Sequence, residues 1–119
     1  MRLKFYGYKK CGTCRKAEKW LNEHDIPYDY IPVVDDPPSR DEIFEMYKKS
    51  GLPIRKWFNT SGKKYRELGL KDKVKHGDEE ALLSLLASDG MLLKRPIVTD
   101  GEQVTVGFNE DTFRNTWSA

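Results

Sequence analysis

Both cysteines of the chain, Cys11 and Cys14, lie in a C-x-x-C motif at the junction of two segments with different hydrophobic patterns. Residues 3–8 before the motif form a short apolar and aromatic run, which predicts a buried strand. After the motif begins, side chains typical of a buried face recur at helical spacing, at Cys14, Ala17, Trp20 and Leu21. We therefore expect a strand, a turn at Cys11 and a helix that ends near His24. A C-x-x-C at such a turn is typical of a redox thiol pair.

The position of Cys11 at the start of a helix favours its ionised form. Only a thiolate attacks a disulfide or an electrophile, and a free thiol is mostly protonated at neutral pH. Unpaired backbone N–H groups and the helix dipole stabilise negative charge at a helix N-terminus. Basic side chains add positive potential around the pair, at Lys9, Lys10, Arg15 and Lys16. We therefore assign Cys11, with a lowered pKa, as the nucleophile and Cys14, one helical turn later, as the resolving thiol.

Two other interpretations of the cysteine pair compete with redox chemistry. A structural zinc site needs four ligands, and the other soft ligands of the chain, His24 and His76, are not spaced as a pair. Alternatively, both thiols pack as small hydrophobic side chains without reacting. The close spacing and the basic flanks favour redox chemistry, and we expect no metal site.

The composition fits a single soluble globular domain over residues 1–119. The net charge is only +2, and acidic and basic residues are interleaved, which gives no support for direct binding to nucleic acid. No stretch approaches the apolar length of a membrane span, and the first residues show no signal-peptide core. Because two such close cysteines cannot hold a secreted fold together, we expect a cytoplasmic protein. We also expect the protein to act as a monomer.

The rest of the chain predicts a second strand, several helices, a β-hairpin and a final helix. The second strand is expected over residues 28–34, and it completes a β-α-β unit whose two strands are parallel. The hairpin is expected over residues 97–106, with Asp100-Gly101 suited to a tight turn. Asn109 is expected to start the final helix.

Two helices between the second strand and the hairpin have clear boundaries. Ser39 and Glu42 form a capping box at the start of one helix, and Gly51 follows its end. Asp78 caps the other helix, and Gly90 is expected to close it.

Residues 52–75, between these two helices, are helical but broken into short pieces. Asn59 or Thr60 is expected to cap the piece over residues 63–67. The expected apolar anchors of the segment are Trp57, Phe58, Tyr65, Leu68 and Leu70. Trp57 and Phe58 fit either the core or a contact surface.

Five blocks, in this order, resemble the arsenate reductase and Spx group of thioredoxin-like proteins. The blocks are Cys11-Gly12-Thr13, residues 37–42, residues 65–70, Arg95-Pro96-Ile97 and residues 106–111. The resemblance covers essentially the whole chain, and it is closest to the short arsenate-reductase-like members that keep both cysteines. It implies an α/β thioredoxin-like fold with a four-stranded mixed sheet and a helical lobe inserted at about residues 39–90.

The resemblance also implies roles for residues outside the C-x-x-C motif. Pro96 would follow a cis peptide bond and face the cysteine loop. Arg95 would lie near Cys11, where its guanidinium can hold an oxyanion or a thiolate. Further candidates for shaping the site or binding the substrate are Gly12, Thr13, Arg15 and Asn59.

The sequence departs from the arsenate reductases that use glutathione and glutaredoxin. Those enzymes place three arginines around the attacking cysteine, and Arg95 matches only one of them. Asn59 and Gly107 align with the other two, a loss of several kcal/mol of charge-assisted hydrogen bonding to an oxyanion. Those enzymes also finish with an external thiol, whereas this chain has Cys14. A true arsenate reductase is therefore an alternative rather than the preferred function.

The Spx branch provides the other alternative. Its members use C-x-x-C as a disulfide switch and bind the C-terminal domain of the RNA polymerase α subunit. Cys11, Cys14 and Arg95 match that pattern. However, a glycine that Spx proteins use at the polymerase surface aligns near Pro53. A redox-switched, polymerase-binding regulator is therefore a weaker hypothesis than thiol chemistry.

The preferred hypothesis is an arsenate-reductase-like thiol-disulfide oxidoreductase. Cys11 attacks, Cys14 resolves, and Arg95 and Pro96 shape the site. No bound cofactor is needed, but an external thiol reductant is, either glutathione with glutaredoxin or thioredoxin. The cellular thiol system is therefore the expected partner.

Overall fold

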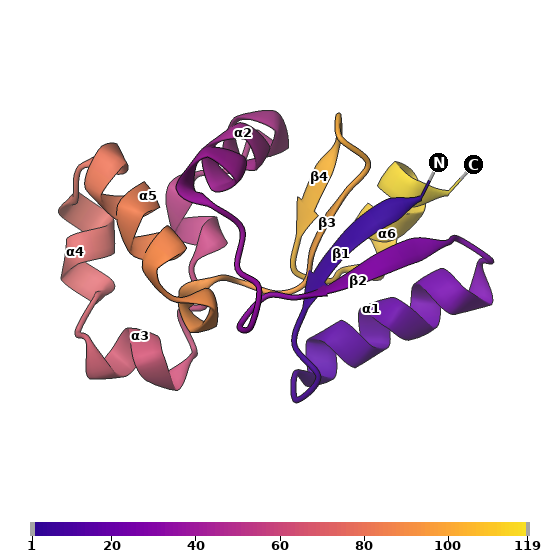
Figure 1. Ribbon diagram of the computed structural model, residues 1–119, viewed down its shortest axis with the longest axis horizontal. Helices are drawn as coiled ribbons and strands as arrows, with labels where there is room; N and C mark the ends of the chain where they lie inside the picture. Colours follow the sequence, from indigo (N-terminus) through magenta and orange to yellow (C-terminus); the bar gives the residue numbers. More distant parts are fainter. Residues whose placement is uncertain (1, 119) are drawn as a thin grey trace.

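The computed structural model describes residues 2–118 and shows a β-α-β unit at the start of the chain (Figure 1). β1 (Leu3–Gly7) leads into α1 (Gly12–Glu23), which returns the chain to β2 (Tyr28–Pro32). β1 and β2 are parallel, as expected, although β2 ends two residues before the predicted boundary.

The end of the chain completes the sheet. β3 (Ile97–Thr99) and β4 (Val104–Val106) form an antiparallel hairpin, and α6 (Glu110–Trp117) follows it. β3 also pairs antiparallel with β1, so the strand order is β2-β1-β3-β4. The predicted α/β thioredoxin-like fold with a four-stranded mixed sheet is therefore confirmed.

The segment between β2 and β3 forms the inserted helical lobe, drawn at the left of Figure 1. It consists of α2 (Arg40–Ser50), a 3₁₀ turn (Ile54–Trp57), α3 (Lys63–Glu67), α4 (Lys71–His76), α5 (Glu79–Ser88) and a second 3₁₀ turn (Gly90–Leu92). Trp57 and Phe58 are both buried in its core rather than exposed as a contact surface.

Each face of the sheet has its own hydrophobic core, because successive side chains of a strand point to opposite faces. Phe5 of β1 packs into the core shared with α1 and α6, where Trp20 and Phe113 meet edge to face with ring centroids 5.5 Å apart. Tyr6, the next residue, belongs to the core shared with the lobe. Both faces of β1 are thus covered by helices.

Three predicted helix caps are present. The Ser39 hydroxyl accepts a hydrogen bond from the Glu42 N–H at 3.1 Å, and the Glu42 carboxylate accepts one from the Ser39 N–H at 2.9 Å. Asp78 and Asn109 likewise cap α5 and α6 through their side chains. Gly51 ends α2 in the left-handed conformation, with φ of 67°.

The predicted cap of α3 is wrong. Gly62 is the N-cap residue, and neither Asn59 nor Thr60 caps this helix. The Asn59 side chain instead accepts a hydrogen bond from the Ser61 hydroxyl at 3.4 Å, and its backbone N–H donates to the Leu92 carbonyl at 2.8 Å. Asn59 thus links the segment before α3 to Leu92 in the second 3₁₀ turn of the lobe.

Other expected details also differ. α5 ends at Ser88, and its C-cap residue is Asp89 rather than Gly90. Gly90 instead belongs to the next 3₁₀ turn, which starts where the Asp89 carboxylate accepts a hydrogen bond from the Met91 N–H. Leu68, expected as an apolar anchor, is 49% exposed.

The hairpin turn is longer than a two-residue turn. Thr99 pairs with Val104, so four residues connect the strands. The Asp100 carboxylate accepts hydrogen bonds from the N–H groups of Glu102 and Gln103 at 2.9 and 2.7 Å, which organises this loop.

Gly90 provides a test of how the lobe packs on the chain that follows β2. A Cβ atom at this position would lie 2.2 Å from the Val33 carbonyl oxygen. We expect Gly90→Ala to lower the free energy of unfolding by about 1–3 kcal/mol, because backbone atoms must move apart. Gly12→Ala is the matched control, since its Cβ would meet nothing within 4 Å. Urea unfolding followed by circular dichroism measures both, and equal stabilities would contradict the close approach.

Candidate active site

The turn between β1 and α1 places the sulfur of Cys11 at the N-terminus of the helix. Cys11 is the N-cap residue, with extended backbone dihedrals. Its N–H donates to the Tyr8 carbonyl at 3.0 Å, and its carbonyl accepts from the Arg15 N–H at 3.2 Å. Its Sγ accepts a hydrogen bond from the Cys14 N–H at 3.3 Å. The sulfur therefore replaces one of the backbone acceptors missing from the first helical turn.

The two thiols have opposite electrostatic environments. Burial disfavours the thiolate of Cys11, but hydrogen bonds from Cys14 and the nearby Arg95 guanidinium outweigh this effect and lower the pKa of Cys11. Burial, followed by the hydrogen bond with Cys11, raises the pKa of Cys14 to about 12. Cys11 is partly exposed and Cys14 is fully buried. The pair therefore consists of an accessible, acidified thiol and a protected, neutral one.

Arg95 is held beside the cysteines by an aromatic ring and a thioether. Its guanidinium carbon lies 5.0 Å from the centre of the Tyr8 ring, and its Nη1 lies 3.7 Å from the Met91 sulfur. Its Nε is buried without a hydrogen-bond partner among the described residues. The peptide bond between Arg95 and Pro96 is cis, as the resemblance implied. The arginine is thus held next to Cys11, with one buried donor unpaired.

Tyr30 is a neighbour of the cysteine pair that the sequence did not reveal. Its ring stacks on Phe5, with centroids 5.6 Å apart, and the Lys9 ammonium lies 4.0 Å from the ring centre. Its hydroxyl is buried without a partner among residues 2–118. Burial is the largest cause that raises the pKa of Tyr30 to about 12, and the charge of Glu18 adds to it, so the hydroxyl stays protonated. The pairing of Tyr30 with Phe5 in the sheet brings it here.

The remaining candidate residues lie in two places. Gly12, Thr13 and Arg15 are exposed in the first turn of α1, beside the sulfur of Cys11. Asn59 makes its hydrogen bonds within the lobe, including one from its backbone N–H to the Leu92 carbonyl. The structure therefore gathers the loop residues at the cysteines, whereas the contacts of Asn59 belong to the lobe.

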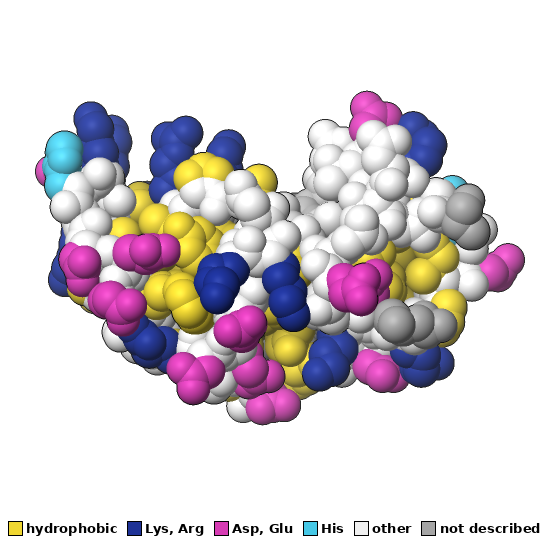
Figure 2. Space-filling view, turned by 90° about the horizontal axis from the view of Figure 1, so that it is seen from above, with side chains coloured by type: hydrophobic (Ala, Val, Ile, Leu, Met, Phe, Trp, Pro, Cys, Tyr) yellow, Lys and Arg dark blue, Asp and Glu magenta, His cyan; other side chains and the backbone are white. Residues whose placement is uncertain are grey.

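The basic flanks act less directly than the sequence indicated. Lys10, Arg15 and Lys16 are exposed, and Lys9 lies over Tyr30. The positive group that lowers the pKa of Cys11 is Arg95, far away in the sequence. Over the face shown in Figure 2, acidic and basic side chains are intermingled rather than separated.

Residues 2–118 contain no group of three or more His, Cys, Asp or Glu side chains placed to hold a metal ion. Within the same residues, every helix is too short or too polar to cross a bilayer.

Comparison with known proteins identifies relatives over nearly the whole chain. The ArsC family model matches residues 6–116. The uncharacterized protein YusI of Bacillus subtilis is 58% identical, over 99% of this chain and 100% of its own length. The global transcriptional regulator Spx of Listeria monocytogenes is 34% identical, over 92% of this chain and 82% of its own length.

Solved structures agree with these relatives. The crystal structure of a putative ArsC family related protein from Bacteroides fragilis is 43% identical, with a TM-score of 0.93 and 97% of each chain covered. An arsenate reductase from Vibrio cholerae is 27% identical, with a TM-score of 0.79 and 89% of each chain covered. The sequence match and the shared fold together show that this chain belongs to the ArsC family.

Proposed function

We propose that the protein is a cytoplasmic thiol-disulfide oxidoreductase in which Cys11 is the nucleophile and Cys14 the resolving thiol. The observation that carries the proposal is the hydrogen bond from the Cys14 N–H to the Cys11 sulfur, at the N-terminus of α1. This bond stabilises the thiolate of the accessible cysteine and keeps the second sulfur within one helical turn of it.

The reaction starts with the thiolate of Cys11 attacking one sulfur of a substrate disulfide. A mixed disulfide forms, and the other substrate sulfur leaves as a thiolate. Cys14 then loses its proton and attacks the Cys11 sulfur, so the second substrate sulfur leaves and a Cys11–Cys14 disulfide remains. The substrate has gained two electrons. An external thiol, from glutathione with glutaredoxin or from thioredoxin, returns the pair to the dithiol state.

The first step makes the second one easier. The pKa of Cys14 is high because of burial, and also because of the hydrogen bond to Cys11 and the negative charge of its thiolate. Both contributions of Cys11 disappear once its sulfur is bonded to the substrate, and only burial still opposes ionisation. Cys14 is therefore protected until a mixed disulfide exists.

Arg95 supports this chemistry better than it supports arsenate reduction. Its single guanidinium lowers the pKa of Cys11, and its unpaired Nε is buried rather than open to a substrate oxygen. An arsenate oxyanion needs several charged donors at once, and Asn59, which aligns with one of the other arginines of the reductases, is uncharged. Disulfide exchange needs only one stabilised thiolate at a time, which this site provides.

Removing the resolving thiol should trap the intermediate. We expect Cys14→Ser, incubated with glutathione disulfide, to accumulate a stable glutathione adduct on Cys11, whereas the unchanged protein forms an internal disulfide. Cys11→Ser should react at least about tenfold more slowly, because its remaining thiol is buried and protonated. Intact-mass spectrometry measures both. Faster reaction of the Cys11→Ser variant would reverse the assignment of the two roles.

The reactivity of Cys11 should depend on pH and on Arg95. The thiolate forms as the pH rises through its pKa, so the alkylation rate of Cys11 should reach half its maximum below the pH typical of a free thiol. In a Cys14→Ser background, Arg95→Met should move this midpoint to higher pH, because the positive charge is lost. Arg15→Met is the matched control and should leave it in place. Rates with iodoacetamide measure the midpoints, and equal shifts in both variants would argue against a specific effect of Arg95.

A second candidate function rests on the 34% identity to Spx over 92% of this chain. In this proposal the Cys11–Cys14 disulfide is a switch that changes binding to the C-terminal domain of the RNA polymerase α subunit.

The purified α-subunit domain can test this candidate directly. We expect its affinity for the oxidised chain to differ at least about tenfold from its affinity for the reduced chain, a coupling of about 1.4 kcal/mol. The Cys11→Ser/Cys14→Ser double variant should show no such difference. Absence of binding by calorimetry in both redox states would remove this candidate and leave the enzymatic proposal.

A further inference from the structure

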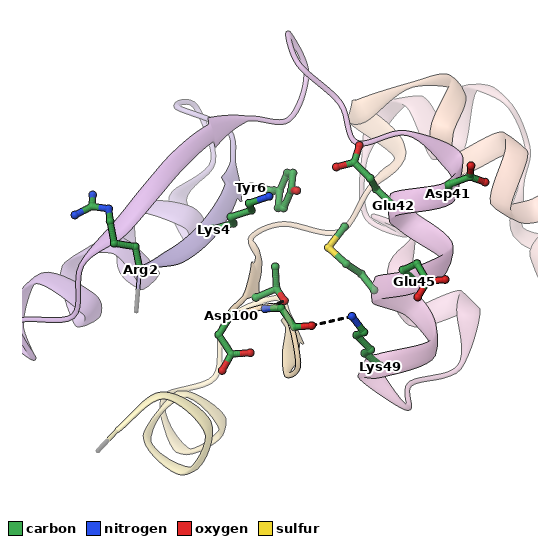
Figure 3. Close-up of a pocket in the computed structure, with 11 residues that line it drawn as sticks. Arg2, Lys4, Tyr6, Asp41, Glu42, Glu45, Lys49 and Asp100 are labelled. Atoms are coloured by element: carbon green, nitrogen blue, oxygen red, sulfur yellow. Dashed lines mark hydrogen bonds between the residues drawn. The ribbon is translucent and has the colours of Figure 1, made fainter.

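A cavity of about 390 Å³ lies between α2 and the sheet face opposite α1 and α6 (Figure 3). Lys4 and Tyr6 of β1 line one side, α2 lines the other, and the β3–β4 turn closes the end. Neither cysteine lines the cavity. Its volume lies at the lower end of the range for small-molecule sites, so it fits a small ligand.

Tyr6 leaves a hydrogen-bonding group unused in this cavity. The residue is only 4% exposed, yet its hydroxyl forms no hydrogen bond within residues 2–118. Figure 3 shows the phenol projecting into the space toward Glu42. Burial, followed by the charges of Glu42 and Asp36, raises the pKa of Tyr6, so the hydroxyl remains a donor. The hydroxyl is not among the fully buried unpaired atoms of residues 2–118, so it reaches the open space of the cavity, where it can donate to a ligand.

Charged groups of opposite sign face the cavity without pairing across it. Lys4 stands beside Tyr6 on the sheet, and Glu42 and Glu45 lie about one turn apart on α2 (Figure 3). No ion pair joins Lys4 to either carboxylate in the described chain. One oxygen of Glu42 accepts from the Ser39 N–H, which leaves its other oxygen available.

Most of the other charged groups at the rim have partners, but Asp41 of α2 has none among residues 2–118. Arg2 pairs with Asp29 at 2.8 Å, and the Lys49 ammonium donates to the Gly101 carbonyl at 2.8 Å, closing one end. Met46, a buried residue of α2 that also lines the cavity, provides an apolar surface. The groups without an ion-pair partner are thus one cation and one neutral donor on β1 and three carboxylates on α2, with Met46 as an apolar patch.

We propose that this cavity binds a free α-amino acid with an apolar side chain. The ammonium group of the ligand is accepted by Glu42 and Glu45, its carboxylate receives hydrogen bonds from Lys4 and Tyr6, and its side chain packs on Met46. An amino acid carries both charges on one carbon, so its head group can bridge two walls that do not reach each other. A simple cation would leave Lys4 and Tyr6 unpaired, and a simple anion would face the carboxylates of α2.

L-Phenylalanine and two truncated analogues test this proposal in the full-length protein. 3-Phenylpropionate lacks the ammonium group and phenethylamine lacks the carboxylate. In a ¹H–¹⁵N NMR titration, we expect L-phenylalanine to cause saturable shifts of the amides of β1 and α2. Each analogue should bind at least about tenfold more weakly, because one set of charge-assisted hydrogen bonds is lost.

Variants that keep the fold locate the contacts. Glu42→Gln/Glu45→Gln removes the charge of these two carboxylates while glutamine retains the capping box with Ser39. Tyr6→Phe removes only the unpaired hydroxyl. We expect each to weaken binding of L-phenylalanine about tenfold or more, as Lys4→Met should. Lys19→Met, on α1 at the other face of the sheet, is the control and should bind normally.

The outcomes separate the proposal from its competitors. No shift at saturating L-phenylalanine would overturn it, and equal binding of phenethylamine would show an organic-cation site instead. The variants leave both cysteines unchanged, so trapping of the mixed disulfide tests the thiol chemistry independently of this cavity.

Discussion

The fold depends on β1 being paired on both edges and covered on both faces. Its parallel partner β2 and its antiparallel partner β3 satisfy its backbone, while Phe5 and Tyr6 anchor two separate cores. Because β1 is fixed in this way, the turn that follows it has little freedom. The cysteine loop leaves the sheet at the end of β1, and the cavity lies along the face that carries Tyr6. One central strand thus positions both the cysteine pair and the cavity.

The asymmetry between the two thiols follows from the geometry of one helical turn. Cys11 precedes the first turn and receives a backbone N–H, whereas Cys14 belongs to the buried face of α1, which packs against the sheet. The spacing that brings the two sulfurs together therefore leaves the Cys11 sulfur partly exposed to solvent and buries the Cys14 sulfur in the core. In a thiol pair, an accessible thiol of lowered pKa is suited to attack and a buried neutral thiol to resolution.

Features that depend on a few consecutive residues were predicted well from the sequence. The caps formed by Ser39, Asp78 and Asn109 need only a side chain and the N–H groups of the next turn. The predicted cap at Asn59 or Thr60 failed because distant groups compete for the same residues: the backbone of Asn59 is tied to Leu92, a contact that no local pattern encodes. Within the lobe, the segment between α2 and α5 is therefore the part least accessible to local rules.

The candidate site shows the same division on a larger scale. The C-x-x-C motif and its place at a strand-to-helix turn were readable from adjacent residues. The proximity of Arg95 to Cys11 followed only from the family resemblance. The place of Tyr30 beside the cysteines was not predicted, although its pairing with Phe5 follows from the parallel register of β1 and β2. Hydrophobic periodicity predicts which face a side chain occupies, but it does not say which residues of other elements meet there.

The surroundings of Arg95 bear on how an ArsC-family protein can differ from the arsenate reductases. The Arg95 guanidinium lies against the Tyr8 ring and the Met91 sulfur, and it lowers the pKa of Cys11. A single arginine of this kind can stabilise one negative sulfur or one oxygen. It cannot by itself surround a multiply charged oxyanion, which requires donors from several directions. Retaining this arginine together with a buried second thiol therefore suits exchange between sulfur atoms, where the charge to be stabilised is small and moves only from one sulfur to the next.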